Sequence, residues 1–291
     1  MGWRTVVISQ RAKVEYAMGY MVVRRQETYR IFMDEVQTVL IATPAVSLTA
    51  VWLNECIRRK IKVIFCDERR NPAAEVLPYC GSHDSSRQIR SQIQWTQESK
   101  EKIWQYIVRE KIYQQVCVLQ DYAHREEAEM LLRYRDAVQP GDATNREGHA
   151  AKVYFNVLWG KEFSRRDDTI TNDALNYGYA ILLSACNREI TASGYMTQLG
   201  IFHDNIFNSF NLGSDLMEVF RPLVDRTVLS AHLVELGTEE KKGLIQVLHQ
   251  TVWMEEKQTL VSQAIGIYCR SVFRAMEESN PALISLYRVK L

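Results

Sequence analysis

Three side chains in the second half of the sequence could together bind one divalent cation. They are Glu147, His203 and Glu218. A donor set of carboxylate oxygens and one imidazole nitrogen suits Mg²⁺ or Mn²⁺, whereas structural zinc would call for thiolates, which this neighbourhood lacks. A cation held by such ligands can activate a nucleophile and stabilise negative charge on a phosphate. The residue types therefore predict a metal-dependent enzyme that carries out phosphoryl transfer.

Glu147 opens an apolar stripe in a helix predicted over residues 145–158. The residues that follow it at helical spacing are Ala150, Ala151, Tyr154, Phe155 and Leu158. A buried carboxylate without a partner is costly, so Glu147 needs a cation, a metal ion or hydrogen-bond donors. Taken alone, such an acid more often complements the dipole of a helix N-terminus or pairs with a neighbour such as Arg146.

A second acidic element follows His203. Ser214 is a candidate N-cap for a helix that starts at Asp215, and this places Asp215 and Glu218 on one face. Asp215 is a candidate additional acid, ranked below Glu218 because acids in a first turn more often complement the helix dipole. Arg221 follows Glu218 by one helical turn and is predicted to orient its carboxylate or to contact phosphate. His203 alone would more often be an ordinary histidine in a polar loop.

Composition favours a globular cytoplasmic protein. The chain has 291 residues, of which 46% are hydrophobic, and 36 basic residues almost cancel 35 acidic ones to give a net charge of +1. This balance gives no overall nucleic-acid signature, so DNA contacts must come from local basic patches. The pair Arg165 and Arg166 is therefore, with Arg221, a candidate DNA or phosphate contact. No secretory signal and no bilayer span is predicted, and we expect no membrane partner.

Other enzyme classes fit the sequence less well. His149 with Cys186 or Ser184 and an acid could form a nucleophilic hydrolase, but no Gly-x-Ser-x-Gly elbow and no Cys-centred protease signature is present. Glycine-rich phosphate loops are also missing, which argues against P-loop and Rossmann enzymes.

Short runs rich in β-branched and aromatic residues predict a small β-sheet domain over residues 1–72. The runs are 5–8, 13–16, 19–23, 28–33 and 38–42. Their close spacing favours an antiparallel meander over parallel strands, which need long crossovers. Ser47 is a candidate cap for a helix that extends to about Lys60, and a further strand is predicted over 62–66.

Residues 73–86 form the predicted linker and residues 87–291 the predicted catalytic domain. The linker contains Pro78 and a polar segment over 82–86. Beyond it the spacing of apolar residues is helical almost to the end of the chain. The fold class that follows is α+β, with a small N-terminal β-sheet domain and a larger all-α catalytic domain.

Five stretches carry a resemblance to a known family. They are Trp3–Ile8, Val63–Asp67, Glu147 in its helix of small residues, Leu199–His203 and Ser214–Asp225. Across essentially its full length the chain resembles the CRISPR-associated adaptation integrase, the larger subunit of the spacer-acquisition complex. A histidine loop followed by Asp-Leu-Met-Glu-Val-Phe-Arg-Pro is specific to this resemblance. The short length and the asparagine-rich loop resemble the type II branch.

The resemblance implies a β domain followed by a helical catalytic domain that binds Mg²⁺ or Mn²⁺ through Glu147, His203 and Glu218. Asp215 matches a second acid of some relatives. Family members form homodimers that bracket a dimer of a small ferredoxin-like partner, and this heterohexamer inserts short DNA duplexes into a repeat array. The implied reaction is attack of a DNA 3′-hydroxyl on a phosphodiester of the repeat. An effector nuclease and a DNA-end-binding accessory protein are further expected partners.

Two other functions remain open from the sequence. A structure-selective nuclease without integrase activity would use the same ligands, but it would hydrolyse DNA and be indifferent to a free 3′-hydroxyl. A non-catalytic DNA-binding scaffold would bind DNA after the ligands are replaced by alanine, and it would show no metal-dependent chemistry.

Overall fold

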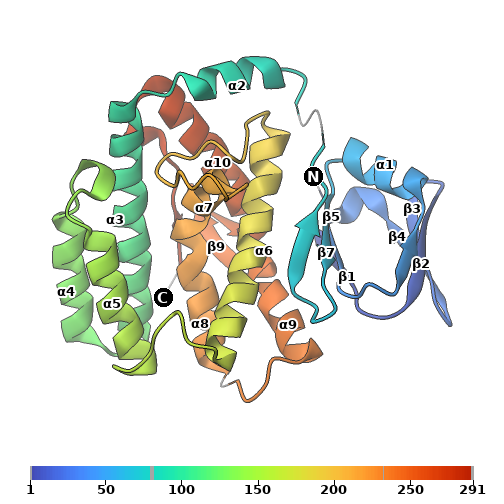
Figure 1. Cartoon of the computed structure of the whole chain (residues 1–291), viewed down its shortest axis with the longest axis horizontal. Helices are drawn as coiled ribbons and strands as arrows, with labels where there is room; N and C mark the ends of the chain where they lie inside the picture. Colours follow the sequence, from blue (N-terminus) through green and yellow to red (C-terminus); the bar gives the residue numbers. More distant parts are fainter. Residues whose placement is uncertain (1, 79–81, 232, 290–291) are drawn as a thin grey trace. The chain divides into compact units, whose positions relative to one another are not determined.

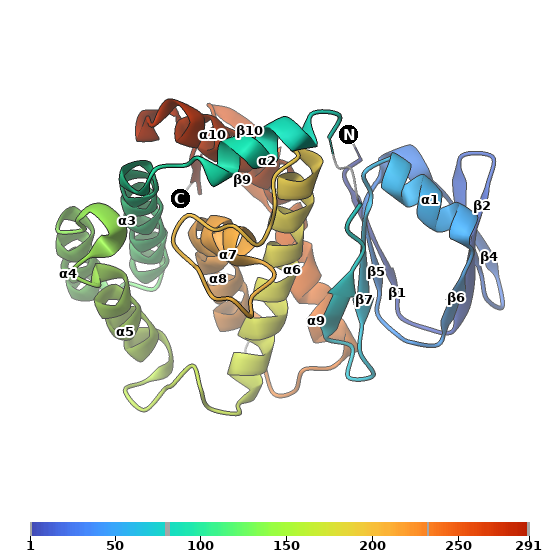
Figure 2. The same cartoon turned by 45° about the horizontal axis from the view of Figure 1, so that its top comes forward.

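The computed structural model describes residues 2–78, 82–231 and 233–289. The chain divides into two compact units, residues 1–85 and 86–291. Strands dominate the first unit and helices the second (Figures 1 and 2). The predicted α+β class is confirmed. Among the described residues, no helix combines the length and the apolar character that crossing a membrane requires.

Two four-stranded sheets make up most of the described part of the first unit. Its elements are β1 (Arg4–Ile8), β2 (Ala12–Ala17), β3 (Tyr20–Arg24), β4 (Thr28–Phe32), η1 (Met33–Glu35), β5 (Val36–Ile41), β6 (Val46–Leu48), α1 (Ala50–Arg58), β7 (Lys62–Cys66) and β8 (Pro72–Glu75). One sheet has the order β1-β5-β7-β8 and the other the order β4-β3-β2-β6. Apolar side chains such as Val14, Val39, Val63 and Trp52 form one core cluster of this unit.

The predicted antiparallel meander is correct for β2, β3 and β4 and wrong for the other sheet. The strands β2–β3 and β3–β4 pair antiparallel, whereas β1, β5 and β7 run parallel. The crossovers that parallel strands require are present because the meander itself connects β1 to β5, and β6 with α1 connects β5 to β7. All positions of β5 are buried, as expected for a strand inside a parallel sheet.

Two local predictions in the first unit need correction. The helix α1 is capped by Thr49, whose side-chain oxygen accepts a hydrogen bond from the Trp52 amide at 3.3 Å, while Ser47 lies in β6. The predicted linker over 73–86 is shorter than expected because β8 pairs antiparallel with β7 and extends the sheet to Glu75. Residues 79–81 of that linker lie outside the described residues.

The second unit is built mainly from helices. Its elements are α2 (Ser85–Ile93), α3 (Gln97–Asp121), α4 (Arg125–Asp136), η2 (Pro140–Asp142), α5 (Arg146–Trp159), α6 (Ile170–Ala192), α7 (Asn211–Met217), η3 (Glu218–Phe220), α8 (Arg221–Ala231), α9 (Thr238–Ile245), η4 (Gln246–His249), β9 (Thr251–Met254), β10 (Lys257–Leu260), α10 (Val261–Glu278), η5 (Pro281–Leu283) and β11 (Tyr287–Arg288). The expected all-α region therefore also contains a small sheet of order β10-β9-β11.

The helix α3 is central to this unit. It packs against α4, α5, α8 and α10 and carries buried residues over most of its circumference (Figure 1). The helix α6 likewise contacts α7, α8, α9 and α10. Because other helices cover most of α3, the polar side chains that it carries inward have to find partners inside the protein.

We predict that Gly178→Ala destabilises the second unit by about 1–3 kcal/mol. A Cβ atom at Gly178 in α6 would lie 2.4 Å from Cγ1 of Val224 in α8, and Val224 is fully buried and cannot move aside. Gly243→Ala in α9 is the matched control, because no atom lies within 4 Å of its Cβ position. The control should stabilise the protein by about 0.5–1 kcal/mol through helix propensity. Urea unfolding of both variants measures the two effects, and a Gly178→Ala protein as stable as wild type would contradict the packing at this crossing.

Candidate active site

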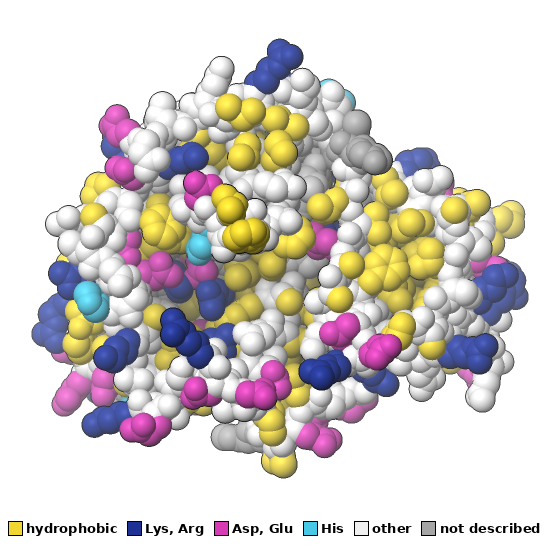
Figure 3. Space-filling model, viewed as in Figure 1, with side chains coloured by type: hydrophobic (Ala, Val, Ile, Leu, Met, Phe, Trp, Pro, Cys, Tyr) yellow, Lys and Arg dark blue, Asp and Glu magenta, His cyan; other side chains and the backbone are white. Residues whose placement is uncertain are grey.

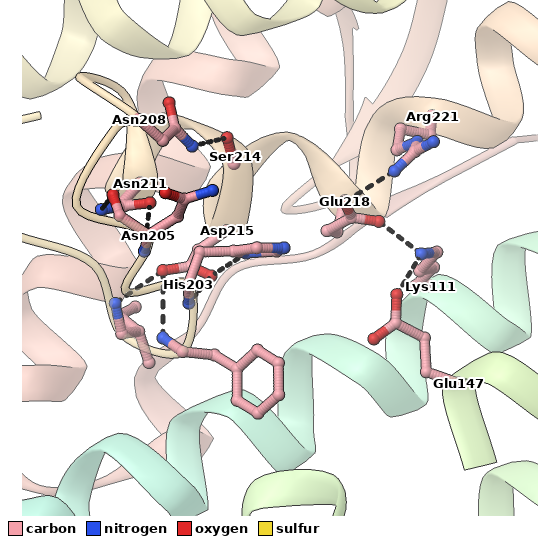
Figure 4. Close-up of polar contacts among 12 residues, drawn as sticks. Lys111, Glu147, His203, Asn205, Asn208, Asn211, Ser214, Asp215, Glu218 and Arg221 are labelled. Atoms are coloured by element: carbon pink, nitrogen blue, oxygen red, sulfur yellow. Dashed lines mark hydrogen bonds and ion pairs between the residues drawn. The ribbon is translucent and has the colours of Figure 1, made fainter. Parts of the chain in front are cut away.

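A lysine ammonium lies between two carboxylates in the second unit. Lys111 Nζ forms ion pairs with Glu147 Oε1 and with Glu218 Oε2, and Arg221 Nη1 donates to Glu218 Oε1 at 2.8 Å (Figure 4). The exposed fraction is 6% for Lys111 and 3% for Glu218. Helices α3 and α5 and the turn η3 thus bring the two predicted acidic ligands to one place.

The charges of this cluster stabilise one another. Burial alone would raise the pKa of Glu218, but Arg221 and Lys111 outweigh it and hold the pKa at about 2. Burial would likewise lower the pKa of the Lys111 ammonium, but Glu147 and Glu218 raise it. Glu218 and Lys111 are therefore both charged at neutral pH.

The start of α5 fixes the backbone at Glu147. Asp142 Oδ1 accepts from the amide of Arg146 at 2.8 Å, and its Oδ2 accepts from the amide of Glu147 at 3.0 Å. Asn145 is the N-cap residue and accepts from the amide of Gly148 at 3.2 Å. These bonds satisfy amides that have no partner inside the helix. The side chain of Glu147 therefore projects from a well-defined first turn of α5 toward Lys111.

A third predicted residue, His203, is held by Asp215. The two oxygens of Asp215 accept from the amides of Ile201 at 2.6 Å, Phe202 at 3.1 Å and His203 at 3.0 Å. His203 Nδ1 lies 2.7 Å from Asp215 Oδ1 (Figure 4). Because a carboxylate can only accept here, Nδ1 carries the proton and Nε2 keeps the lone pair. The hydrogen bond to Asp215 also raises the pKa of His203.

The loop passes so close to Asp215 that it requires a glycine. A Cβ atom at Gly200 would lie 2.2 Å from the carbonyl oxygen of His203 and 2.8 Å from Asp215 Oδ2. On the other side, the ring of Phe202 stacks on Trp104 of α3 at a centroid distance of 4.5 Å. The histidine is thus fixed from two directions.

The sequence-based view of this segment needs correction. Ser214 does not cap a helix, because α7 already begins at Asn211, and its hydroxyl accepts from Asn208 Nδ2 at 3.3 Å. Asp215, expected as an additional acid for the cation, has an exposed fraction of 0%, and its oxygens already accept the hydrogen bonds of the histidine loop. We therefore assign Asp215 a positioning role.

We predict that Asp215→Ala destabilises the protein by about 3 kcal/mol, because it removes the acceptor of one buried and several partly buried donors. Hydrogen exchange of the amides of residues 201–203 should accelerate, and the thermal midpoint should fall. The matched control is Asp204→Ala, since Asp204 lies in the same loop and is exposed. Equal exchange rates in the two variants would contradict the positioning role.

A further buried acid, Asp225, is connected to the cluster. Asp225 of α8 accepts hydrogen bonds from the hydroxyls of Tyr154, at 3.1 Å, and Tyr179. The guanidinium carbon of Arg221 lies 4.1 Å from the centroid of the Tyr179 ring, and that of Arg165 lies 5.4 Å from it. A continuous polar chain therefore connects Glu218 through Arg221 and Tyr179 to Asp225.

The candidate phosphate contacts are in different situations. Arg221 and Arg165 share the ring of Tyr179, and Arg165 also hydrogen-bonds Asn176 at 2.6 Å. Arg166 is exposed, and its backbone amide donates to Ser164 Oγ at 3.2 Å. The structure thus brings Arg221 and Arg165 toward Glu218, while no described contact connects Arg166 to the cluster.

We predict a pH-dependent stability contribution from Asp225. Burial raises its pKa from 3.8 to about 6, against the opposing effects of the tyrosine hydroxyls, Arg221 and Lys111. The folded protein therefore holds this proton more tightly than the unfolded chain, so stability falls as pH rises from about 4 through 6. In Asp225→Asn this titration is absent. The free energy of unfolding of wild type, relative to Asp225→Asn, should fall by about 2 kcal/mol between pH 4 and pH 7. Urea unfolding at both pH values measures it, and a constant difference would contradict the raised pKa.

The surface of the second unit is hollowed next to charged side chains. In Figure 3 lysine, arginine, aspartate and glutamate side chains gather in this hollow on the left of the view, with a histidine at its edge. His203 exposes 38% of its side chain and Glu147 exposes 24%. Glu147 and the imidazole can therefore be approached from solvent, whereas Glu218 is buried.

The residues fit the predicted divalent cation in chemistry. Within the described ranges, no group of three or more His, Cys, Asp and Glu side chains is gathered closely enough to hold a metal ion. The two carboxylates are instead gathered around Lys111. Glu218 Oε2 forms an ion pair with Lys111 Nζ, and the tautomer of His203 leaves Nε2 with its lone pair. Two carboxylates and one imidazole nitrogen are ligands that Mg²⁺ and Mn²⁺ accept.

Lys111, Asp142, Tyr179 and Asp225 were missed in the sequence. A signal existed for Lys111, because it follows Trp104, Ile107 and Val108 at helical spacing on an otherwise apolar face of α3. The same reasoning that identified Glu147 would have identified it. Tyr179 and Asp225 lie among apolar residues of the core and gave no comparable signal.

The second unit of this α+β fold carries two carboxylates and an imidazole, which are ligand types that metal-dependent phosphoryl-transfer enzymes use. Residues 5–258 match the model of the family described as CRISPR associated protein Cas1. The chain belongs to this family.

Relatives support the assignment over the whole length. The chain is 30% identical over 294 residues to the CRISPR-associated endonuclease Cas1 of Neisseria meningitidis serogroup C (strain 8013), covering 98% of this chain and 96% of the relative. In fold it resembles a casposase bound to integration product, with a TM-score of 0.78, 18% identity and coverage of 96% and 92% of the two chains. It also resembles a chain of a Cas6-RT-Cas1--Cas2 complex, with a TM-score of 0.75, 19% identity and coverage of 97% of this chain and 36% of that longer chain.

Proposed function

We propose that this chain is a metal-dependent DNA integrase and endonuclease of CRISPR adaptation. It inserts short DNA duplexes into a repeat array by attack of a 3′-hydroxyl on a phosphodiester. The observation that carries the proposal is that Glu147 and Glu218 meet at the Lys111 ammonium in a chain of the Cas1 family. The fixed imidazole of His203 is near enough for the charges of both glutamates to raise its pKa.

Glu147, His203 and Glu218 would hold Mg²⁺ or Mn²⁺ in this site. When bound, the cation lowers the pKa of a coordinated hydroxyl and neutralises charge on the phosphate. Asp215 keeps the His203 tautomer in which Nε2 can act as a ligand. Arg221 holds Glu218 ionised and oriented. Arg165 and Arg166 are the proposed contacts for DNA phosphates, since charged guanidinium groups bind phosphate oxygens well.

Assembly and location form part of the same proposal. We propose a homodimer that binds double-stranded DNA and a small ferredoxin-like partner in a heterohexamer, in the cytoplasm. The solved chain of the Cas6-RT-Cas1--Cas2 complex supports a role in a multiprotein assembly, and the casposase bound to integration product supports strand insertion as the reaction. A place in the type II branch, with an effector nuclease and a DNA-end-binding protein as further partners, is the finer proposal.

We predict that Glu147→Gln abolishes strand transfer. The assay uses a labelled short duplex with free 3′-hydroxyls, a plasmid with leader and repeat, the small partner protein, and Mg²⁺ or Mn²⁺. Loss of a metal ligand should lower the rate of strand transfer on the order of 100-fold or more. This effect is larger than that of replacing a residue that only hydrogen-bonds to a metal ligand. Glutamine keeps the volume of the side chain, so the variant tests charge and ligation. Glu129→Gln on the exposed face of α4 is the matched control.

The same assay separates the competing functions. Joining that needs metal and a free 3′-hydroxyl supports the integrase. Metal-dependent cutting without joining would favour a structure-selective nuclease that uses the same residues. DNA binding without any reaction, unaffected by Glu147→Gln, would favour a non-catalytic scaffold and contradict the proposed function.

A further inference from the structure

The position between Glu147 and Glu218 is taken by a positive charge that belongs to the chain itself. Lys111 Nζ pairs with one oxygen of each carboxylate, and both Lys111 and Glu218 are buried. Two carboxylates this close would repel each other strongly without a cation between them. The Lys111 ammonium therefore offsets the repulsion between the two carboxylates in the absence of metal, as a bound metal ion would.

Charge repulsion disfavours simultaneous binding of the Lys111 ammonium and a divalent cation by Glu147 and Glu218. Lys111 and Arg221 together balance Glu147 and Glu218, so the cluster is neutral as it stands. A divalent cation bound by the same carboxylate oxygens would add two positive charges within a few ångströms of the ammonium. At such distances in a protein interior, like charges repel by several kcal/mol.

We propose that Lys111 is a built-in counter-ion that competes with the divalent cation for Glu147 and Glu218 and thereby sets the metal affinity of the site. Metal binding must first separate the ammonium from both carboxylates. This inference rests on the proposed metal ligands. Lys111 has a positioning role, because it holds the two carboxylates together until a metal ion replaces it.

The surroundings favour competition over a purely structural role. Lys111 is carried by α3, which is held by α4, α5, α8 and α10, so the site does not collapse when the ammonium leaves the carboxylates. Glu218 keeps Arg221 as a second partner at 2.8 Å, and Glu147 is 24% exposed and can be solvated. Each carboxylate can therefore exchange Lys111 for another cation.

The test is Mn²⁺ binding by calorimetry to the full chain without DNA, together with thermal unfolding with and without Mn²⁺. Lys111→Met should bind Mn²⁺ at least about 10-fold more tightly than wild type, because the competing charge is gone. Its midpoint of unfolding should fall without metal and rise with Mn²⁺ by more than that of wild type. Lys111→Gln should also bind more tightly, while Lys111→Arg, which keeps the charge, should not.

A matched control comes from the first unit. Lys62 is 3% exposed and pairs with Glu75 at 2.7 Å, so Lys62→Met also removes a buried lysine from an ion pair. It should lower stability and leave the Mn²⁺ affinity unchanged. Unchanged or weaker Mn²⁺ binding in both Lys111→Met and Lys111→Gln would overturn the competition.

Two further outcomes are decisive. If neither wild type nor the Lys111 variants bind Mn²⁺, both the proposed metal ligands and the counter-ion role of Lys111 are wrong. If wild type binds Mn²⁺ and the Lys111 variants bind it with the same affinity, only the counter-ion role is wrong. If Lys111→Met folds only with Mn²⁺, the competition is supported. If it never folds, the charge-balanced double variant Lys111→Met with Glu147→Gln should fold, and failure of that variant as well would make Lys111 a packing residue.

Discussion

The structure of the second unit depends on the need to neutralise carboxylates that are withdrawn from water. Glu218 exposes 3% of its surface and is charged because Lys111 and Arg221 face it. This requirement explains why α3, an interior helix, carries a lysine among apolar residues. It also explains why Arg221 follows Glu218 by one helical turn. The helices of this unit are therefore fixed relative to one another by charge as well as by apolar contact.

Three buried acids of this unit have different properties because their partners differ. Glu218 faces two cations, and its pKa is held at about 2. Asp225 faces two tyrosine hydroxyls, and burial raises its pKa to about 6. Asp215 receives backbone amides and one imidazole and shapes the loop that carries His203. The same functional group, a carboxylate, thus supplies a candidate ligand, a proton-binding group and a loop anchor, according to its environment.

Local patterns predicted much of the fold, and contacts distant in sequence account for what was missed. The strands of the first unit and the helix that carries Glu147 follow from periodicity and capping. The parallel pairing of β1 with β5 did not follow, because it depends on which segments serve as crossovers. Glu147, His203 and Glu218 could be proposed from residue type and spacing. Lys111 and Asp225 act through partners far along the chain, and the early start of α7 at Asn211 changed the role of Asp215.

An internal counter-ion has a consequence for how such a site can form. If the carboxylates had no positive partner, the unit would need a metal ion in order to fold, as small metal-dependent domains do. With Lys111 and Arg221 present, the charges of Glu147 and Glu218 are balanced without a metal ion, and under the proposal this balance would lower the affinity for a divalent cation. A site of the proposed kind would be stable without metal and would bind metal reversibly, because the gain from the divalent charge would be reduced by the loss of the lysine pair. The position of Lys111 therefore connects the folding of the unit with the chemistry proposed for it.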